Sequence, residues 1–203
     1  MSVYLAALRQ HSWRRAETDY IMPIWLPFLP GILTLAGLVG LIPAALLGPG
    51  ALAGGLVVLV VLVILGVAVG IYVVYKWIKR RNDHFDRQIM LMRATVDALR
   101  ELNKERGGVA DIEIAALERE IAEAQIEERE KSAILWVILY LFVTEIVWFY
   151  IAHFLNKDFF KHEMREDRML GYVDRALSAL GLPPIGFSRI YKIPERSTLL
   201  YII

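Results

Sequence analysis

Residues 51–74 read ALAGGLVVLVVLVILGVAVGIYVV, and this stretch decides the fold class of the chain. It contains no charged residue, no amide and, before Tyr72, no hydroxyl. As an α-helix it would rise roughly 36 Å, enough to cross a hydrocarbon core of ~30 Å with some tilt. A buried helix of a soluble protein is seldom both this apolar and this long, so a transmembrane helix is predicted. Aromatic and basic residues meet directly after it, at 76–85 (KWIKRRNDHF), as they do at a membrane–water boundary.

The distribution of charge supports the same class. The chain has 203 residues, is 57% hydrophobic and has a mean hydropathy of +0.46, yet it carries 23 basic and 22 acidic residues. Those charges are almost absent from 21–75 and 133–154 and dense elsewhere, a segregation typical of integral membrane proteins. The formal net charge of +1 provides no global field, so nucleic acid is not an expected partner. The absence of cysteine excludes disulfides, thiolate metal sites and a cysteine nucleophile.

The residues before this stretch predict a second crossing joined to it by a tight turn. Prolines crowd the start of the first hydrophobic block, so its regular helix is expected from about Pro30. Gly-Pro-Gly at 48–50 is a strong turn signal. Residues 21–77 are therefore expected to form a transmembrane helical hairpin. Gly66 and Gly70 have the small-residue spacing that lets membrane helices pack closely.

Basic residues flank the hairpin and none lies in its turn. The basic segment 1–20 precedes it, and four basic residues follow it: Lys76, Lys79, Arg80 and Arg81. By the positive-inside rule, both ends of the hairpin are expected in the cytoplasm. The four residues that follow it are candidate contacts for acidic lipid headgroups as well as determinants of topology.

Residues 78–131 form a charged insert with a helical period. Apolar residues recur at spacings of four and three on both sides of Gly107-Gly108, which is the heptad period. We expect a cytoplasmic, coiled-coil-like antiparallel helical hairpin, whose apolar stripe is covered by its own second arm or by another subunit. The residues of this stripe are Phe85, Ile89, Met92, Val96, Leu99, Ile114, Leu117 and Ile121.

Residues 132–155 form a third apolar block, rich in aromatic side chains and long enough to span. Thr144 and Glu145 lie at its centre, where an ionised carboxyl costs at least a few kcal/mol unless it is neutral, paired or wetted. A straight span would place the C-terminal third outside, whereas a re-entrant segment bent near Glu145 would keep it inside. Length favours a third membrane helix, which is the prediction, although the basic flank at 157–168 favours the bent alternative.

The last part of the chain, residues 156–203, predicts an amphipathic helix followed by a tail. Apolar residues recur on one side of 156–181, and Gly181 with two following prolines ends the helix. The tail consists of short apolar pieces that are too short to cross a membrane.

Two parts of the chain share one pattern: an apolar block with aromatic edges, a basic and aromatic patch, then a helix. Residues 82–87 (NDHFDR) align with 157–162 (KDFFKH), and 96–99 (VDAL) echoes 173–177 (VDRAL). In this respect the chain resembles a group of multi-span archaeal membrane proteins built from repeated units of a membrane segment and a cytoplasmic helix with such a His-Phe-Arg patch. The segment 194–203 (PERSTLLYII) looks like the start of another unit. The resemblance implies an archaeal membrane protein and does not supply a function.

Motifs for catalysis and cofactor binding are missing from the sequence. It has no HExxH, no Walker A, no GxGxxG and no GxSxG, and none of its serines lies in a nucleophile motif. His84 and His162 would contribute to a metal site only if the two repeated patches met. The prediction is therefore a protein that is not an enzyme, with no catalytic residue, no cofactor and no metal site.

Taken together, the sequence predicts an all-α integral membrane protein. The expected function is that of a structural or scaffolding membrane protein, or an accessory subunit of a larger membrane assembly, that acts through helix–helix association. Its partners would be lipids and copies of itself or other membrane subunits, and the envelope of an archaeal virus is one setting for such a protein. The alternative is a small transporter or channel that uses the intramembrane carboxylate of Glu145.

Overall fold

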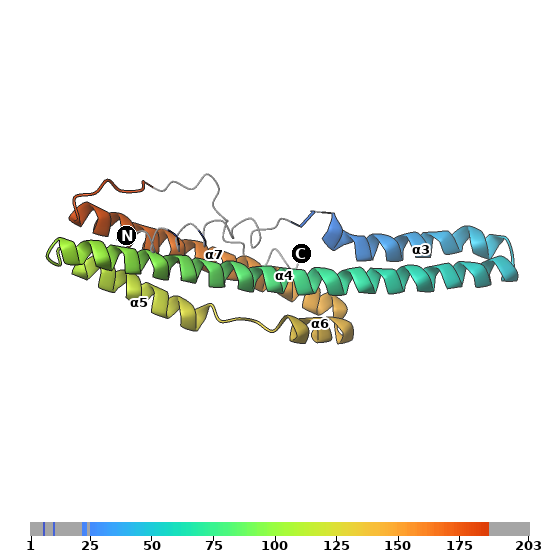
Figure 1. The fold of residues 1–203 in the computed structure, drawn as a ribbon. Helices are drawn as coiled ribbons and strands as arrows, with labels where there is room; N and C mark the ends of the chain where they lie inside the picture. Colours follow the sequence, from blue (N-terminus) through green and yellow to red (C-terminus); the bar gives the residue numbers. More distant parts are fainter. Residues whose placement is uncertain (1–5, 7–9, 11–21, 24, 187–203) are drawn as a thin grey trace. The chain divides into compact units, whose positions relative to one another are not determined.

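The structure is a computed structural model that describes residues 6, 10, 22, 23 and 25–186, apart from the side chain of Glu145. Over this part of the chain all regular structure is helical, which confirms the all-α prediction. The elements are η1 (Leu26–Phe28), α3 (Leu29–Leu46), α4 (Pro49–Glu105), α5 (Asp111–Glu127), α6 (Ala133–Phe142) and α7 (Thr144–Ala179) (Figure 1). The tail from 187 and nearly all of the basic segment 1–20 lie outside the described residues, so what was expected there stays a prediction.

The chain divides into two compact units. Residues 25–79 and 132–148 belong to one, here called the apolar unit, and residues 80–131 and 149–186 belong to the other, here called the bundle. Both α4 and α7 contribute residues to each unit. The two units are described separately below.

In the apolar unit, α3 and the first part of α4 are joined by the predicted turn. Leu47 caps α3, Gly48 has a φ of +108°, which glycine adopts without a side-chain clash, and Pro49 begins α4. Pro43 lies inside α3 without ending it. The sequence signals at 48–50 therefore turn the chain where they were expected to.

Two helices in the described residues are long and apolar enough to cross a membrane. One is the 21-residue stretch Leu26–Leu46 and the other is the 57-residue α4. Only 6% of the most apolar window of the first, and 22% of that of α4, is buried inside the protein. The core helix of a soluble protein would be mostly buried, so this exposure favours lipid as the surroundings.

Glycines allow α3 and α4 to approach closely. A Cβ built on Gly37 would lie 2.7 Å from Leu59 Cδ1 and 3.2 Å from Leu59 Cα, and one on Gly66 would lie 3.2 Å from the carbonyl oxygen of Pro30. At Gly70 a Cβ would collide with the hydroxyl of Tyr140, which comes from α6. Gly66 and Gly70 therefore both lie at close packing contacts, but against different helices.

The third apolar block at 132–155 is not the one continuous helix that was predicted, because the helix is broken at Val143. α6 begins after Ser132, whose Oγ accepts a hydrogen bond from Leu135 N at 3.2 Å, and ends at Phe142 after 10 residues. Val143 has φ −140° and ψ +55°, outside the helical region, and α7 starts at the next residue. The Thr144 hydroxyl donates to the carbonyl oxygen of Tyr140 at 2.9 Å, so a side chain serves a helix-end carbonyl.

Aromatic side chains pack the short helix within the apolar unit. Trp148, in the first turns of α7, lies 5.2 Å between ring centroids from Trp77 of α4 and 6.0 Å from Tyr140 of α6. Tyr140 is buried, whereas Phe142 is 82% exposed. One side of α6 thus contacts α4 and the other presents apolar side chains outward.

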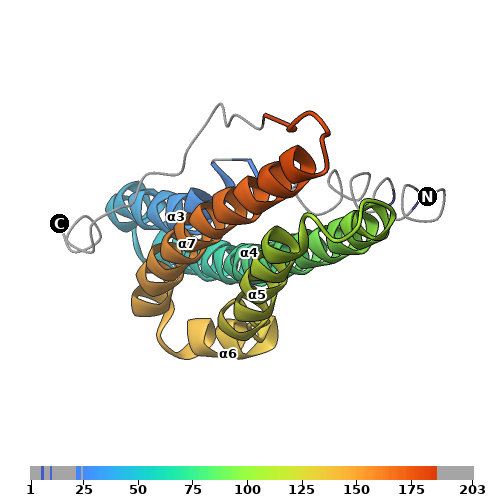
Figure 2. The ribbon, with the colours of Figure 1, turned by 90° about the vertical axis from the view of Figure 1, so that its left-hand side faces the viewer.

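The bundle is made by α4, α5 and α7, whose ribbons are seen in Figure 2. One apolar core lies between them. α5 runs antiparallel to α4, because Arg81 contacts Arg129 at one end of the pair and Asn103 contacts Asp111 at the other. α7 runs parallel to α4, because the contacts Arg81–Asp158 and Gln88–Glu166 join residues 77 and 78 positions apart. The buried core residues are Met92, Val96, Leu99, Ala110, Ile114, Leu117, Ile121, Ala124, Met169, Val173, Ala176 and Leu180.

The predicted two-helix insert is therefore incomplete without α7. The heptad stripe lies in the core. Phe85, its first residue along α4, is buried, and Ile89 is partly buried and packs against the core. The predicted amphipathic helix covers this stripe with residues such as Met169 and Val173. Met164 of the same helix is half exposed and lies outside this core. A two-helix stripe leaves one side open, and a third helix from the same chain closes it.

Asn103 fixes the turn between α4 and α5. It is buried; its Oδ1 accepts from Ala110 N at 2.8 Å and its Nδ2 donates to Asp111 Oδ1 at 2.6 Å. Gly107 and Gly108 have φ values of +75° and +82°, the left-handed region that this turn requires. The double glycine was expected to break the helix, and the asparagine that braces the break was not foreseen.

The α3–α4 contact can be tested with a matched pair of glycine substitutions. Gly37→Ala should destabilise the protein by about 1–3 kcal/mol, because the new methyl group meets the backbone and side chain of Leu59. Gly40→Ala makes the same chemical change three residues along α3, where a Cβ meets nothing within 4 Å, and should be neutral or slightly stabilising. Thermal unfolding in mild detergent measures both, and equal midpoints would contradict this packing.

Candidate functional site

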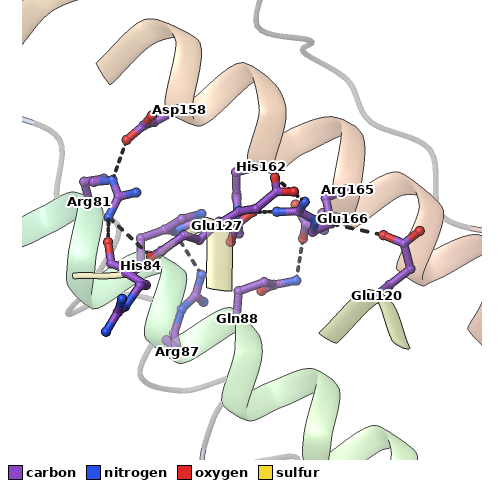
Figure 3. Close-up of polar contacts among 12 residues, drawn as sticks. Arg81, His84, Arg87, Gln88, Glu120, Glu127, Asp158, His162, Arg165 and Glu166 are labelled. Carbon is purple, nitrogen blue, oxygen red and sulfur yellow. Dashed lines mark hydrogen bonds and ion pairs between the residues drawn. The ribbon is translucent and has the colours of Figure 1, made fainter. Parts of the chain in front are cut away.

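A buried polar cluster lies at the end of the bundle where α4 and α7 enter it. Its side chains come from the first turns of α4 in the bundle, from the end of α5 and from α7 (Figure 3). Apolar residues occupy the core positions beyond it, so the polar residues that remain on the inner faces of the three helices meet here. This is the densest set of buried charges in the described residues, and it is therefore the candidate site.

Arg81 links all three helices. It is 2% exposed, and its Nε donates to Asp158 Oδ2 at 2.8 Å. Its Nη1 donates to Asn82 Oδ1 at 3.1 Å and to the carbonyl oxygens of Glu128 and Arg129 at 3.4 and 2.8 Å. The guanidinium also lies 4.4 Å from the centroid of the Phe85 ring, a cation–π contact. The rigid fork of an arginine matches several acceptors at once, which a lysine cannot do.

Next to Arg81, the Glu128 carboxylate contacts both His162 and Arg165. Its Oε2 lies 2.8 Å from His162 Nδ1, and its Oε1 accepts from Arg165 Nη1 at 2.8 Å. Arg165 also donates from Nη2 to Glu127 Oε2 at 2.7 Å. Glu128, His162 and Arg165 are all buried, so the carboxylate lies between two basic groups away from water.

The charges in this network shift each other's pKa values. Burial, the largest single influence on Glu128, raises its pKa, but the hydrogen bonds and charges of His162 and Arg165 outweigh it, so the pKa is lowered. Burial lowers the pKa of Arg165, whereas its hydrogen bonds to Glu127 and Glu128 raise it, and the net direction is upward. The pKa of the exposed Glu127 is lowered by its hydrogen bond to Arg165. The ionised forms are therefore the stable ones.

The two repeated patches of the sequence meet beside this network. Phe85, of the first patch, stacks on His162, of the second, with ring centroids 4.1 Å apart and an interplanar angle of 13°. His84 lies 5.2 Å from His162 and 5.8 Å from Phe159 between ring centroids. The patches were expected to correspond in sequence, and in the structure they pack against each other.

The meeting of the patches does not produce a metal site. His162 uses Nδ1 on Glu128, and His84 Nδ1 lies 3.2 Å from Arg87 Nη2. No group of three or more His, Cys, Asp or Glu in the described residues could hold a metal ion. His162 Nε2 is buried without a hydrogen-bond partner in this part of the chain.

An open cavity of about 330 Å³ lies against the network. Its lining consists of Phe85 and six charged residues: Arg81, Lys161, Arg165, Glu127, Glu128 and Asp158. Cations and carboxylates balance in this lining, and the buried ones are paired with each other. This set of paired charges, here called the lock, joins the three helices of the bundle.

The basic residues predicted to face lipid headgroups separate into two groups. Lys76 is exposed and lies 5.9 Å above the ring of Tyr72, and Lys79 is exposed one turn further along α4. Arg80 is partly buried. Arg81 is the core-facing member of the run: it is buried in the lock and pairs with Asp158, so its side chain is not exposed to headgroups. Its role as a determinant of topology stays a prediction.

Thr144 and Glu145, predicted as intramembrane polar residues, lie in the first turn of α7 directly after the break. The Thr144 side chain bonds to Tyr140, as described above. The structure therefore places the polar pair at a helix terminus and not in the middle of a continuous helix. The sequence analysis gave a bend near Glu145 as the alternative, but a straight helix was predicted because the block is long enough to span a membrane.

The partners in the lock were missed from the sequence. Glu128 lies among several acidic residues at the end of α5, and nothing local distinguishes it from Glu123 or Glu130. Its contact with His162 joins residues 34 positions apart. The available signal was the basic and aromatic patch that occurs twice, because two such patches on two helices of one bundle need carboxylates between them.

Comparisons of the chain with protein-family models, with curated proteins and with solved structures find no match. The resemblance to archaeal multi-span membrane proteins therefore stays a prediction based on the repeated patches.

Glu128→Gln should reduce the acid sensitivity of the bundle. Because folding lowers the pKa of Glu128, its contribution to the free energy of unfolding is complete above the ordinary carboxyl pKa of about 4.3 and is lost as the pH falls through the lower folded-state pKa. At neutral pH the free energy of unfolding of the variant should be lower by ~3 kcal/mol. This is the low end for breaking a buried pair, because Arg165 keeps its hydrogen bond to Glu127. On acidification, the free energy of unfolding of the variant should then fall by less than that of the wild type.

Circular dichroism melts from about pH 7 to about pH 3 measure this acid sensitivity. Glu123→Gln is the matched control, because Glu123 forms an exposed pair with Arg119 on the same helix and should change stability by less than about 0.5 kcal/mol. Parallel acid profiles for wild type and Glu128→Gln would contradict the assigned role.

Arg81→Lys tests the lock from the other side. A lysine can reach Asp158 but cannot also serve the carbonyl oxygens of Glu128 and Arg129, so we expect a loss of about 2 kcal/mol in the free energy of unfolding. Arg93→Lys is the same substitution at an exposed position of α4 and should be silent. Denaturant unfolding followed by far-UV circular dichroism compares the two variants, and equal effects would show that Arg81 acts only as a surface charge.

Proposed function

We propose that this protein is a structural or scaffolding membrane protein, or an accessory subunit of a larger membrane assembly, that acts through helix–helix association. In this proposal α3 and the first part of α4 cross the bilayer as a hairpin, and lipids and other membrane helices are the partners. A viral or cellular archaeal membrane is a suitable setting for such a protein.

The observation that carries the proposal is the exposure of the two apolar helices. Side chains such as Leu35, Ile42, Val57 and Ile64 are each more than 60% exposed, on both α3 and α4. An apolar surface of this extent would aggregate in water, so lipid or other apolar helices must cover it. The two helices also satisfy their own backbone hydrogen bonds, as a bilayer requires.

The proposed orientation places the N-terminus and residues 78–131 in the cytoplasm. The support is the basic residues before α3, together with Lys76 and Lys79 after the apolar part of α4, against an uncharged turn at 47–50. The side chains of Lys76 and Lys79 are exposed, and in this orientation they would lie at the level of acidic headgroups.

The properties of the bundle favour a scaffold over an enzyme. Its apolar stripe is buried inside the chain, the buried charges of Arg81, Glu128 and Arg165 are paired, and two of its cavities are open grooves on the surface. The outward faces of α3 and α4 are then the surfaces that contact other subunits, and cysteine crosslinking on these faces can detect the contact. The heptad stripe is not the contact surface, because it is covered by α7.

A small transporter or channel is the second candidate. One observation favours it: α7 begins at a break inside an apolar segment, with Thr144 and Glu145 in its first turn. Discontinuous membrane helices with polar residues at the break are a recurring feature of ion and substrate sites. In that case Glu145 would bind a proton or a cation.

One set of measurements separates the two candidates. For a scaffold we expect an oligomeric mass in mild detergent and disulfide crosslinking of single-cysteine variants on the outward helix faces, such as Ile42→Cys or Val57→Cys, in a chain without native cysteine. Leu117→Cys, in the bundle core, is the control and should not crosslink. Glu145→Gln should leave mass and crosslinking unchanged. A monomeric mass, together with a pH-dependent flux in proteoliposomes that Glu145→Gln abolishes, would favour the transporter.

A further inference from the structure

The bundle holds together the two ends of the segment that contains α6. The Lys131 side chain lies 4.9 Å from the centroid of the Phe154 ring and 3.5 Å from Asp158 Oδ2. The Lys131 backbone is fixed by Asn82, whose Nδ2 donates to its carbonyl at 2.8 Å and whose Oδ1 accepts from its amide at 3.1 Å. The chain thus leaves the bundle at Lys131 and returns to it beside the same residue.

The helix directions lead to the same conclusion. α4 enters the bundle near Arg81, and Arg81 pairs with Asp158 of α7. Because α7 runs parallel to α4, it enters the bundle at the same end, and α5 brings the chain back to that end at Lys131. All three connections between the bundle and the apolar residues therefore leave from one end of the three-helix unit.

The segment between these points is too short to cross a bilayer and return. A crossing helix needs about 20 residues, and two crossings would need about twice that number. The 10 residues of α6 rise roughly 15 Å, about half of a ~30 Å hydrocarbon core, before the chain breaks at Val143. α7 starts at the next residue and reaches the bundle from Phe149 onward.

The surface and the backbone of this segment suit the interior of a lipid leaflet. Ile134, Phe142 and Ile146 are each more than two-thirds exposed and none is polar. At the break, Val143 N donates to Leu139 O at 2.9 Å, and the Tyr140 carbonyl accepts from the Thr144 hydroxyl. Two of the backbone groups at the break thus have hydrogen-bond partners within the segment, which lowers the cost of placing the break in hydrocarbon.

We infer that residues 132–148 form a re-entrant hairpin that enters only the leaflet on the bundle's side, with its outward side chains against the acyl chains of that leaflet. α7 consequently stays on the same side of the membrane as residues 80–131. This inference rests on the proposed crossing of the bilayer by α3 and α4, and it adds a lipid-binding surface and fixes the side of the C-terminal third.

Single-cysteine labelling in sealed proteoliposomes tests the inference, since the chain has no native cysteine. A charged, membrane-impermeant maleimide reports the outward-facing fraction of Leu47→Cys at the α3–α4 turn, Lys104→Cys near the end of α4 and Ser178→Cys near the end of α7, all of them exposed positions. We expect equal labelled fractions for Lys104→Cys and Ser178→Cys, and the complementary fraction for Leu47→Cys. The comparison holds for any mixture of orientations in one preparation.

The possible outcomes separate the inference from the proposed function. A labelled fraction for Ser178→Cys that follows Leu47→Cys would show a straight span and overturn the re-entrant hairpin while leaving the α3–α4 crossing intact. Equal fractions for Leu47→Cys and Lys104→Cys would overturn the membrane hairpin itself, and the inference with it. Ile185→Cys, exposed beyond the end of α7, repeats the measurement if Ser178→Cys is not monodisperse in detergent.

Depth is tested separately at Phe142→Cys, at the end of α6. The free thiol of this variant should be inaccessible to the maleimide from either side. In a separate sample labelled with a membrane-permeant bimane, bromines placed near the ends of lipid acyl chains should quench the fluorescence more strongly than bromines near the headgroup. The reverse order of quenching would show that α6 lies flat at the interface, which would overturn entry into the leaflet.

Discussion

The parallel pairing of α4 with α7 constrains the rest of the structure. Two parallel helices in one bundle need a return path, and α5 provides it on the bundle side, from Asn103 at one end to Lys131 at the other. The link from α5 to α7 must then begin and end beside Arg81. Seen in this way, the break at Val143 follows from the connectivity of the bundle, because a straight helix over 132–155 would carry α7 away from its partner.

The buried ionic lock gives this pairing its register. Apolar residues spaced by three and four allow a helix to slide by one heptad with little loss of packing, whereas Arg81 and Glu128 each find their partners in one register only. Breaking a buried pair leaves a charge without compensation, which costs about 3–5 kcal/mol. The lock therefore specifies which turn of α7 meets which turn of α4, while the apolar core supplies most of the stability.

Features set by local sequence were predictable, and features set by distant contacts were not. Uninterrupted apolar residues gave α3 and the start of α4, and the heptad spacing gave core residues such as Leu99 and Leu117. The arrival of α7 as the third helix depends on contacts 77 and 78 residues apart, for which no local pattern exists. The choice between a straight and a bent third block turned on length, although Thr144 and Glu145 already marked the position of the break. Arg81 was grouped with its basic neighbours because nothing in the run distinguishes the one that faces the core.

The order of these contacts along the chain has a consequence for biosynthesis. The α4–α5 turn forms from residues eight positions apart, so that hairpin can close soon after it leaves the ribosome. α7 follows only after roughly 50 more residues, several seconds later at a translation rate of ~5–20 residues per second. During that interval Met92 and Val96 face an empty third position in the core. A nascent chain of this design thus passes through an aggregation-prone stage that ends when α7 covers these residues.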